Sequence, residues 1–184
     1  MPSDVSLDPR TNEFYVCDSL NHRIMRFSMN VPIGTVVAGG NGQGTGNTQL
    51  NYPNRAFFDI YSDSIFITNT ASHNVIQWVL GQNTWLLVAG SASFSPGNTA
   101  ALLSFPIGVV VDHMKNIYVA DTENHRIQLF LANSSIGITI AGLTGNAGST
   151  SDSLSFPHAL CIDSQMNLYV ADTLNERVQK FLFQ

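Results

Sequence analysis

The side chains best suited to chemistry fall within one six-residue stretch. Asp121, His125 and Arg126 lie in YVADTENHRIQLF, at 118–130. An acid, an imidazole and a guanidinium at this spacing could move a proton or hold an anion. The stretch has three further copies: YVCDSLNHRIMRF at 15–27, FITNTASHNVIQW at 66–78 and YVADTLNERVQKF at 169–181. Because a catalytic acid is rarely built in several equivalent places, the repetition favours a structural role.

Comparing the copies indicates what the acid and the arginine do. Three copies carry both groups, at Asp18 and Arg23, Asp121 and Arg126, and Asp172 and Arg177. The second copy has Asn69 and Asn74, so acid and base are lost together. Since the two positions face each other across a turn, we predict a cross-strand, hydrogen-bonded ion pair. Losing one charge alone would leave its partner unpaired in a half-buried place, whereas losing both is tolerated.

A histidine also recurs, as His22, His73 and His125, and Glu176 takes its position in the fourth copy. A ring of histidines suggests a metal site. However, strands lie about 4.8 Å apart, so turns on neighbouring sheets should be separated by roughly 10 Å or more. Zinc ligands must lie about 2 Å from one ion. We therefore expect surface histidines in turns, and no metal.

The sequence around these Asp, His and Arg groups predicts short strands. In the third unit, apolar runs at 108–112, 116–120, 125–130 and 137–141 are separated by polar turns. Four strands joined by tight turns, repeated every 51 or 52 residues, are typical of β-propeller blades. We predict an all-β propeller of four-stranded antiparallel blades. These blades occupy 2–40, 53–90, 106–142 and 157–184, and the last lacks its fourth strand.

The repeat also resembles a known family. Each copy fits aromatic–Val/Ile–x–Asp/Asn–Ser/Thr and ends on Phe or Trp. VAG or IAG follows at 37–39, 88–90 and 140–142, and a long loop then ends on an aromatic–proline pair. This pattern resembles the NHL repeat over essentially the whole chain. The resemblance implies a propeller, commonly of six blades, that serves as a binding module in proteins such as tripartite-motif ligases and sensor kinases.

Residues that follow the aromatic–proline pairs are expected to ring the mouth of the central channel. These positions vary from copy to copy while the surrounding residues repeat. Variable positions on a shared face are candidates for ligand recognition. From this set we take Asp4, Asn54, Arg55 and His158 as the candidate ligand-binding residues. We predict a non-catalytic binding or scaffold module for a protein or peptide ligand.

The alternative function is an enzyme of the six-bladed lactonase or lyase type. His158 follows Pro157, and a Pro–His step ligates zinc in the related peptidyl-hydroxyglycine lyases. Those enzymes need several such histidines, whereas Ser, Asn and Ile follow the other prolines here. G-x-S-x-G, C-x-x-C and H-E-x-x-H motifs are also missing from the sequence. We therefore assign no catalytic residue and expect no cofactor.

Composition narrows the possible partners. The net charge is −5 and the eight Lys and Arg residues are scattered, so nucleic acid, including the RNA bound by some NHL domains, is not expected. No run approaches the roughly 18 apolar residues of a membrane helix, and the start has no apolar signal core. The sequence does not indicate a compartment. We expect Cys17 and Cys161 to be buried free thiols.

The two ends of the chain raise the question of closure. The first unit begins at Pro2 in mid-repeat, and the last stops after its third strand. We expect a portion of a larger ring, with a closed four-bladed ring and pairing with a second copy as alternatives. An open stack would associate through its exposed blade edges.

Overall fold

The computed structural model describes residues 1–182 as four antiparallel sheets. Blade 1 contains β1 (Pro2–Asp8), β2 (Glu13–Asp18), β3 (Arg23–Phe27) and β4 (Thr35–Gly39). Blade 2 contains β5 (Pro53–Asp59), β6 (Ser64–Asn69), β7 (Asn74–Val79) and β8 (Leu86–Gly90). Blade 3 contains β9 (Pro106–Val111), β10 (Ile117–Asp121), β11 (Arg126–Phe130) and β12 (Gly137–Gly142). Blade 4 contains β13 (Pro157–Ile162), β14 (Leu168–Asp172) and β15 (Arg177–Phe181).

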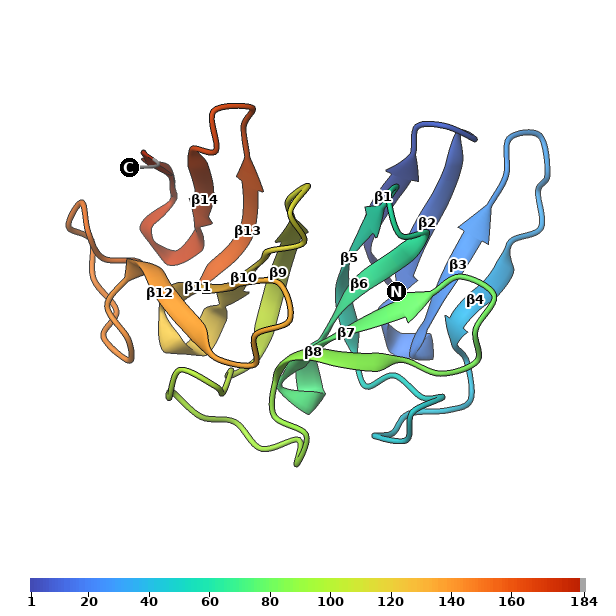
Figure 1. Ribbon diagram of the computed structural model, residues 1–184, viewed down its shortest axis with the longest axis horizontal. Coiled ribbons are helices and arrows are strands. Elements are labelled where there is room, and N and C mark those ends of the chain that lie inside the picture. Colours follow the sequence, from blue (N-terminus) through green and yellow to red (C-terminus); the bar gives the residue numbers. More distant parts are fainter. Residues whose placement is uncertain (183–184) are drawn as a thin grey trace.

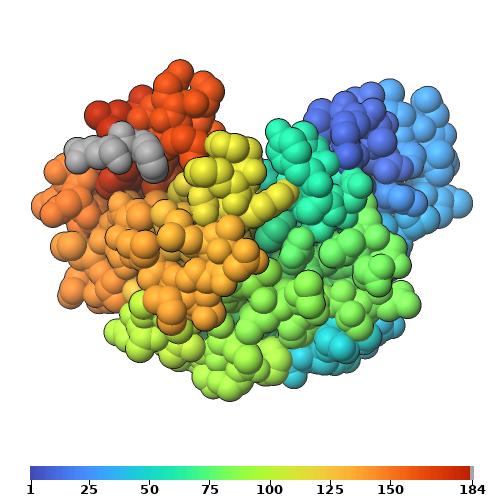
Figure 2. Space-filling view, viewed as in Figure 1, coloured from blue at the N-terminus to red at the C-terminus, as the bar shows by residue number. Residues whose placement is uncertain are grey.

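This architecture confirms the predicted all-β propeller, including a fourth blade with three strands among the described residues. The predicted end of that blade, at 183–184, lies outside the described residues. Within each blade the strands follow chain order, and the first strands of neighbouring blades contact one another. The blades fan out in an arc around these first strands (Figure 1). Blades 1 and 4 stand apart at the two ends of the arc, with a notch between them (Figure 2).

The core consists of three apolar layers, one between each pair of neighbouring blades. Side chains of a strand alternate between the face toward the preceding blade, here called the incoming face, and the face toward the following blade, the outgoing face. Both faces of the middle blades are covered, so every residue of β6 and β10 is buried. In β15 of blade 4, half-buried and exposed residues alternate instead. The repeat therefore places its core between blades.

The second and third strands of each blade are joined by a single turn of 3₁₀ helix, where the sequence predicted a simple turn. These are η1 (Ser19–Asn21), η2 (Thr70–Ser72), η3 (Thr122–Asn124) and η4 (Thr173–Asn175). The next residue is left-handed, for example His125 at φ 55°. The glycine of the VAG or IAG strand end packs on that residue. A Cβ on Gly142 would lie 2.2 Å from the His125 carbonyl oxygen, which explains why glycine recurs there.

Candidate functional site

The three predicted acid–arginine pairs all form within their turns. The arginine Nε lies 2.8 Å from a carboxylate oxygen in Asp18–Arg23, Asp121–Arg126 and Asp172–Arg177. In blade 3 the two side chains are buried, with 3% of Arg126 and 0% of Asp121 exposed. The Arg126 Nη atoms also donate to backbone carbonyls of the preceding loop, at Asn98, Thr99 and Leu102, over 2.8–3.0 Å. The guanidinium therefore fastens that loop to the turn.

The carboxylates of Asp121 and Asp172 each accept several hydrogen bonds. Asp121 accepts hydrogen bonds from the Ser104 N–H at 2.7 Å and from Asn124 Nδ2 at 2.8 Å, besides Arg126. Burial raises the pKa of Asp121, and these donors act against that rise. In blade 4, burial opposes ionisation of Asp172, but hydrogen bonds outweigh it and lower its pKa. Such bonding supports the proposal that the acid–arginine pairs have a structural role in holding the turns.

Blade 2 has neutral groups in this place. Asn69 and Asn74 are cross-strand partners, and both are completely buried. Asn69 Oδ1 accepts the Asn51 N–H at 2.6 Å, as Asp121 accepts that of Ser104. However, Asn69 Nδ2, Ser72 Oγ and Asn74 Oδ1 are buried without a hydrogen-bond partner among residues 1–182. The neutral pair keeps the loop contact and leaves three polar atoms unsatisfied.

A tryptophan that lies outside the repeat motif takes over part of the arginine's role in blade 2. Trp85 Nε1 donates to the carbonyl oxygens of Gly46 at 3.2 Å and Gln49 at 3.0 Å. These carbonyls stand at the loop positions that Thr99 and Leu102 occupy before blade 3, where Arg126 binds. The carbonyl groups thus find a donor in both blades. Sequence reasoning missed Trp85 because it compared only the repeated stretches.

The recurring histidines lie in the turns, as predicted, but they also join neighbouring blades, and His73 is buried where a surface position was expected. Their Nδ1 atoms accept the N–H of the aromatic residue that opens the next blade. The three bonds join Tyr52 to His22 at 3.2 Å, Phe105 to His73 at 3.2 Å and Phe156 to His125 at 3.3 Å. In each pair the rings meet edge to face, with centroids 4.5–4.7 Å apart. His73 is only 7% exposed.

This histidine bond holds an unusual backbone conformation. Phe105 precedes Pro106 yet has φ 46°, and a bulky left-handed residue before proline is disfavoured. An Nδ1 acceptor and a ring contact stabilise it. Burial also lowers the pKa of His22 and of His73, which favours the neutral ring that can accept a hydrogen bond.

A hydroxyl beside each histidine forms a second bond to the next blade. It donates to the carbonyl of the proline that begins the next first strand. Ser19 Oγ bonds to Pro53 at 2.5 Å, Thr70 Oγ1 to Pro106 at 2.7 Å and Thr122 Oγ1 to Pro157 at 2.8 Å. Each of the three blade junctions therefore has the same two polar bonds beside its apolar layer.

At the channel mouth the structure brings together some of the predicted ligand-binding residues. Arg55 Nη1 lies 3.5 Å from an Asp4 carboxylate oxygen, and the other oxygen accepts the Ala56 N–H at 3.0 Å. His158 is half-buried; burial, and then the nearby Arg55, lower its pKa. Asn54 takes part through its backbone, where its carbonyl accepts the Ser3 hydroxyl at 2.7 Å. Arg55 and His158 remain partly open to solvent.

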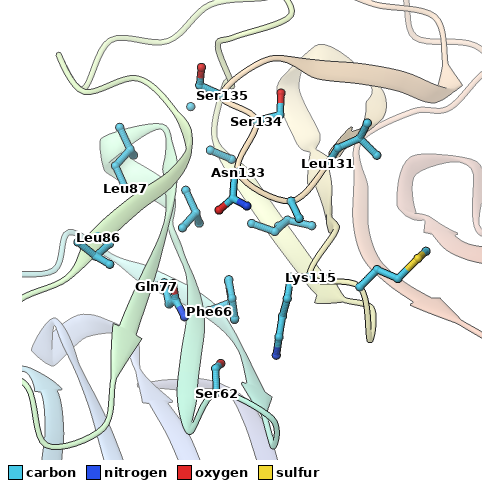
Figure 3. A pocket seen from close by; sticks show the side chains of 16 residues that line it. Ser62, Phe66, Gln77, Leu86, Leu87, Lys115, Leu131, Asn133, Ser134 and Ser135 are labelled. Atoms are coloured by element: carbon cyan, nitrogen blue, oxygen red, sulfur yellow. The ribbon is translucent and has the colours of Figure 1, made fainter.

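The sequence did not predict a groove of about 690 Å³ between blades 2 and 3. Leu86 and Leu87 of β8 line one wall, Leu131 lines the other, and Asn133 lies between them (Figure 3). Lys115 borders the groove and bonds to Asp59 across the junction. The corresponding hollow between blades 1 and 2 is about 180 Å³, and Trp78 lines it.

Residues 1–182 contain no group of three or more His, Cys, Asp or Glu side chains placed to hold a metal ion. No helix in the same range is long and apolar enough to cross a membrane.

Of the two thiols, Cys17 is buried as predicted. Cys161 is exposed, contrary to the prediction, because it lies on the outgoing face of blade 4.

Comparison with known proteins agrees with this fold. A model of the NHL repeat matches residues 103–130 and 154–181. NHL repeat-containing protein 2 of Bos taurus is 38% identical over 87 residues, covering 43% of this chain and 12% of that protein. Protein SUPPRESSOR OF QUENCHING 1, chloroplastic, of Arabidopsis thaliana is 26% identical over 200 residues, covering 97% and 19%. The chain thus spans less than a fifth of either relative. NHL repeats are thus present at two positions of a chain that has the β-propeller fold.

Solved structures share the fold at low identity. A Bacteroides thetaiotaomicron protein of unknown function has a TM-score of 0.78 at 18% identity, covering 97% of this chain and 46% of that one. A chain of a nidogen/laminin complex has 0.72 at 17%, covering 98% and 59%. A streptogramin B lyase has 0.65 at 9%, covering 99% and 54%. This chain spans about half of each solved chain.

Proposed function

We propose that the chain is a non-catalytic binding module that presents its channel mouth to a protein or peptide ligand. The observation that carries this proposal is that the recurring polar side chains hold the fold together, whereas the non-recurring ones at the channel mouth do not. The recurring Asp, Arg, His and Ser/Thr groups are used in holding turns and blades together. Arg55 and His158 do not recur and stay partly open at the mouth. Residues outside the framework are those available for recognition.

The charge at the mouth suggests the chemistry of the ligand. Arg55 is a permanent cation with a planar set of donors, which suits carboxylate groups. Asp4 offsets part of this charge from 3.5 Å away. His158 adds a second nitrogen group close to Arg55. We infer that an acidic side chain of the ligand binds between Arg55 and His158. A chain of a nidogen/laminin complex has the same fold, which supports a protein ligand.

The test is selection of random peptides displayed on phage against the folded chain, followed by affinity measurements on variants. We expect acidic peptides whose binding is lost in Arg55→Ala and weakened in His158→Ala. Arg26→Ala is the matched control, because Arg26 is also a partly exposed arginine in an ion pair. Binding that survives Arg55→Ala but is lost in Leu131→Asp would move the site to the groove between blades 2 and 3. Failure to select any peptide would contradict a binding module.

A second candidate function is lyase chemistry, favoured by His158 at the mouth and by the likeness to streptogramin B lyase. A catalytically inactive form of virginiamycin B lyase from Staphylococcus aureus, solved with quinupristin, has a TM-score of 0.62 at 13% identity. Incubating the chain with quinupristin and following the product by mass spectrometry tests this candidate. Turnover that disappears in His158→Ala would favour the enzyme over the binding module.

A further inference from the structure

The loop between β4 and β5, at 40–52, contains a place where a backbone nitrogen can attack a side-chain amide. Asn41 is followed by Gly42, and this is the only Asn–Gly step in the sequence. Glycine favours such an attack because it has no Cβ to hinder the approach of its own nitrogen. The loop joins blade 1 to blade 2 and lies at the lower right of Figure 1.

The two groups that would react are accessible, and the attacking nitrogen is free. Asn41 and Gly42 are both exposed. The backbone N–H groups of Gly40 and Gly44 donate to carbonyl groups elsewhere in the chain, whereas that of Gly42 has no hydrogen-bond partner within residues 1–182. A Cβ built on Gly42 would meet only Gln49 Nε2, at 4.0 Å, so this residue stands clear of its neighbours. The fold therefore leaves the nitrogen available.

The Asn41 residue holds the loop across its base. Its Nδ2 donates to the Thr48 carbonyl at 3.1 Å, and its backbone carbonyl accepts Gln49 Nε2 at 3.0 Å. The carbonyl of Gln49 in turn accepts the indole N–H of Trp85 at 3.0 Å. Because the bond to Thr48 is exposed, water can replace it and release the Asn41 amide for reaction.

We propose that Asn41 is a site of spontaneous deamidation. The Gly42 nitrogen loses its proton and forms a bond to Asn41 Cγ, while the Cγ–Nδ2 bond breaks and ammonia leaves with that proton. The product is a five-membered succinimide ring. Water, the only co-reactant, then opens the ring at either carbonyl, which gives aspartate or isoaspartate at position 41.

Deamidation changes how the loop is held. Either product removes the bond to Thr48, because a carboxylate has no hydrogen to donate. The isoaspartate product also routes the backbone through Cγ, so the carbonyl that accepts Gln49 Nε2 becomes part of a free carboxylate. The loop at 40–52 thus gains a negative charge and loses contacts that hold it beside Trp85. We expect faster hydrogen exchange in this loop after conversion.

Incubation of the folded chain at mildly alkaline pH, in heavy-oxygen water, followed by peptide mapping with mass spectrometry tests this proposal. The same chain unfolded in urea gives the intrinsic rate of the step. We expect Asn41 to convert in the folded chain within a few-fold of that rate, with uptake of heavy oxygen. Conversion should quicken as pH rises, because the Gly42 nitrogen must lose its proton. Asn146, which is exposed and followed by Ala147, is the internal control and should stay unchanged.

Two variants separate the chemistry from its structural effect. Asn41→Gln should remain intact, because its longer side chain does not form the five-membered ring. Asn41→Asp should reproduce the faster hydrogen exchange of the loop without any incubation. An Asn41 that stays intact while the unfolded chain is converted would overturn the proposal, since the fold would then protect the step. Conversion of Asn146 as fast as that of Asn41 would also overturn it, because Gly42 would then have no special role.

Discussion

The turns of blade 2 and blade 3 have the same backbone and different chemistry. Blade 3 uses a buried ion pair, in which Arg126 reaches the carbonyl groups of the preceding loop. Blade 2 replaces the pair with two asparagines and brings in Trp85 as donor to the equivalent carbonyls. What the two turns share is a side-chain donor to two equivalent loop carbonyl groups, those of Gly46 and Gln49 in blade 2 and of Thr99 and Leu102 in blade 3. The difference shows that the loop carbonyl groups keep a side-chain donor when both charges are lost, although three polar atoms of the neutral turn stay unpaired within residues 1–182.

Breaking the ion pair of blade 3 should have the largest effect. We expect Arg126→Ala to lower the free energy of unfolding by about 3–5 kcal/mol, because it leaves the Asp121 carboxylate buried without its cation. Urea unfolding measures this change. Arg26→Ala removes a partly exposed ion pair and should cost at most about 1 kcal/mol. Equal losses in the two variants would contradict the structural role of Arg126, as would lost ligand binding at unchanged stability.

Adding one charge to blade 2 should have the next largest effect. Asn69→Asp introduces a buried carboxylate with no arginine at position 74, and we expect a loss of about 2 kcal/mol at neutral pH. Because burial raises the pKa of such a carboxyl, the loss should shrink as pH falls and the group becomes neutral. Asn83→Asp, in an exposed loop, is the control and should be close to neutral. A fully tolerated Asn69→Asp would show that the turn does not discriminate against a lone charge.

Removing the indole donor should have a smaller effect. Trp85→Phe keeps most of the ring and loses the N–H that serves Gly46 and Gln49. We expect a loss of about 1 kcal/mol, which is the usual net value of a hydrogen bond. Hydrogen exchange of the loop at 40–52 would show whether the loss is local. If neither stability nor exchange changes, Trp85 is not the counterpart of Arg126.

Lowering the pH should produce the smallest effect, at the histidine bonds. Burial places the folded pKa of His22 and His73 below the unfolded value of about 6.5. The unfolded chain therefore binds more protons as pH falls through 6.5, and stability should decline until pH drops below the folded pKa. Melting temperatures between pH 7.5 and 5 measure this decline. A His22→Gln/His73→Gln double variant should show a flatter profile, and an unchanged slope would assign the pH dependence to other groups.

The repeat period and its strand pattern were enough to predict the blades, because each strand alternates or runs apolar within a fixed 51- or 52-residue unit. The ion pairs could be inferred because Asn69 and Asn74 change together. The histidine bonds could not be inferred in this way, because each histidine accepts its hydrogen bond from a residue of the next repeat unit. Cys161 follows the same pattern as buried strand residues elsewhere, so its exposure depends on what covers blade 4. The groove beside Leu131 depends on how two blades splay apart.

Because the core lies between blades, local stability should vary along the arc. Blades 2 and 3 are each covered on both faces, and blades 1 and 4 on one. In such an array stability is close to a sum of nearest-neighbour contacts, so opening starts where one contact holds a blade. Amide protons of β6 and β10 should therefore outlast those of β2 and β14 in hydrogen exchange. The chain would fray from both ends toward its centre, and the junction of blades 2 and 3 would be the last to open.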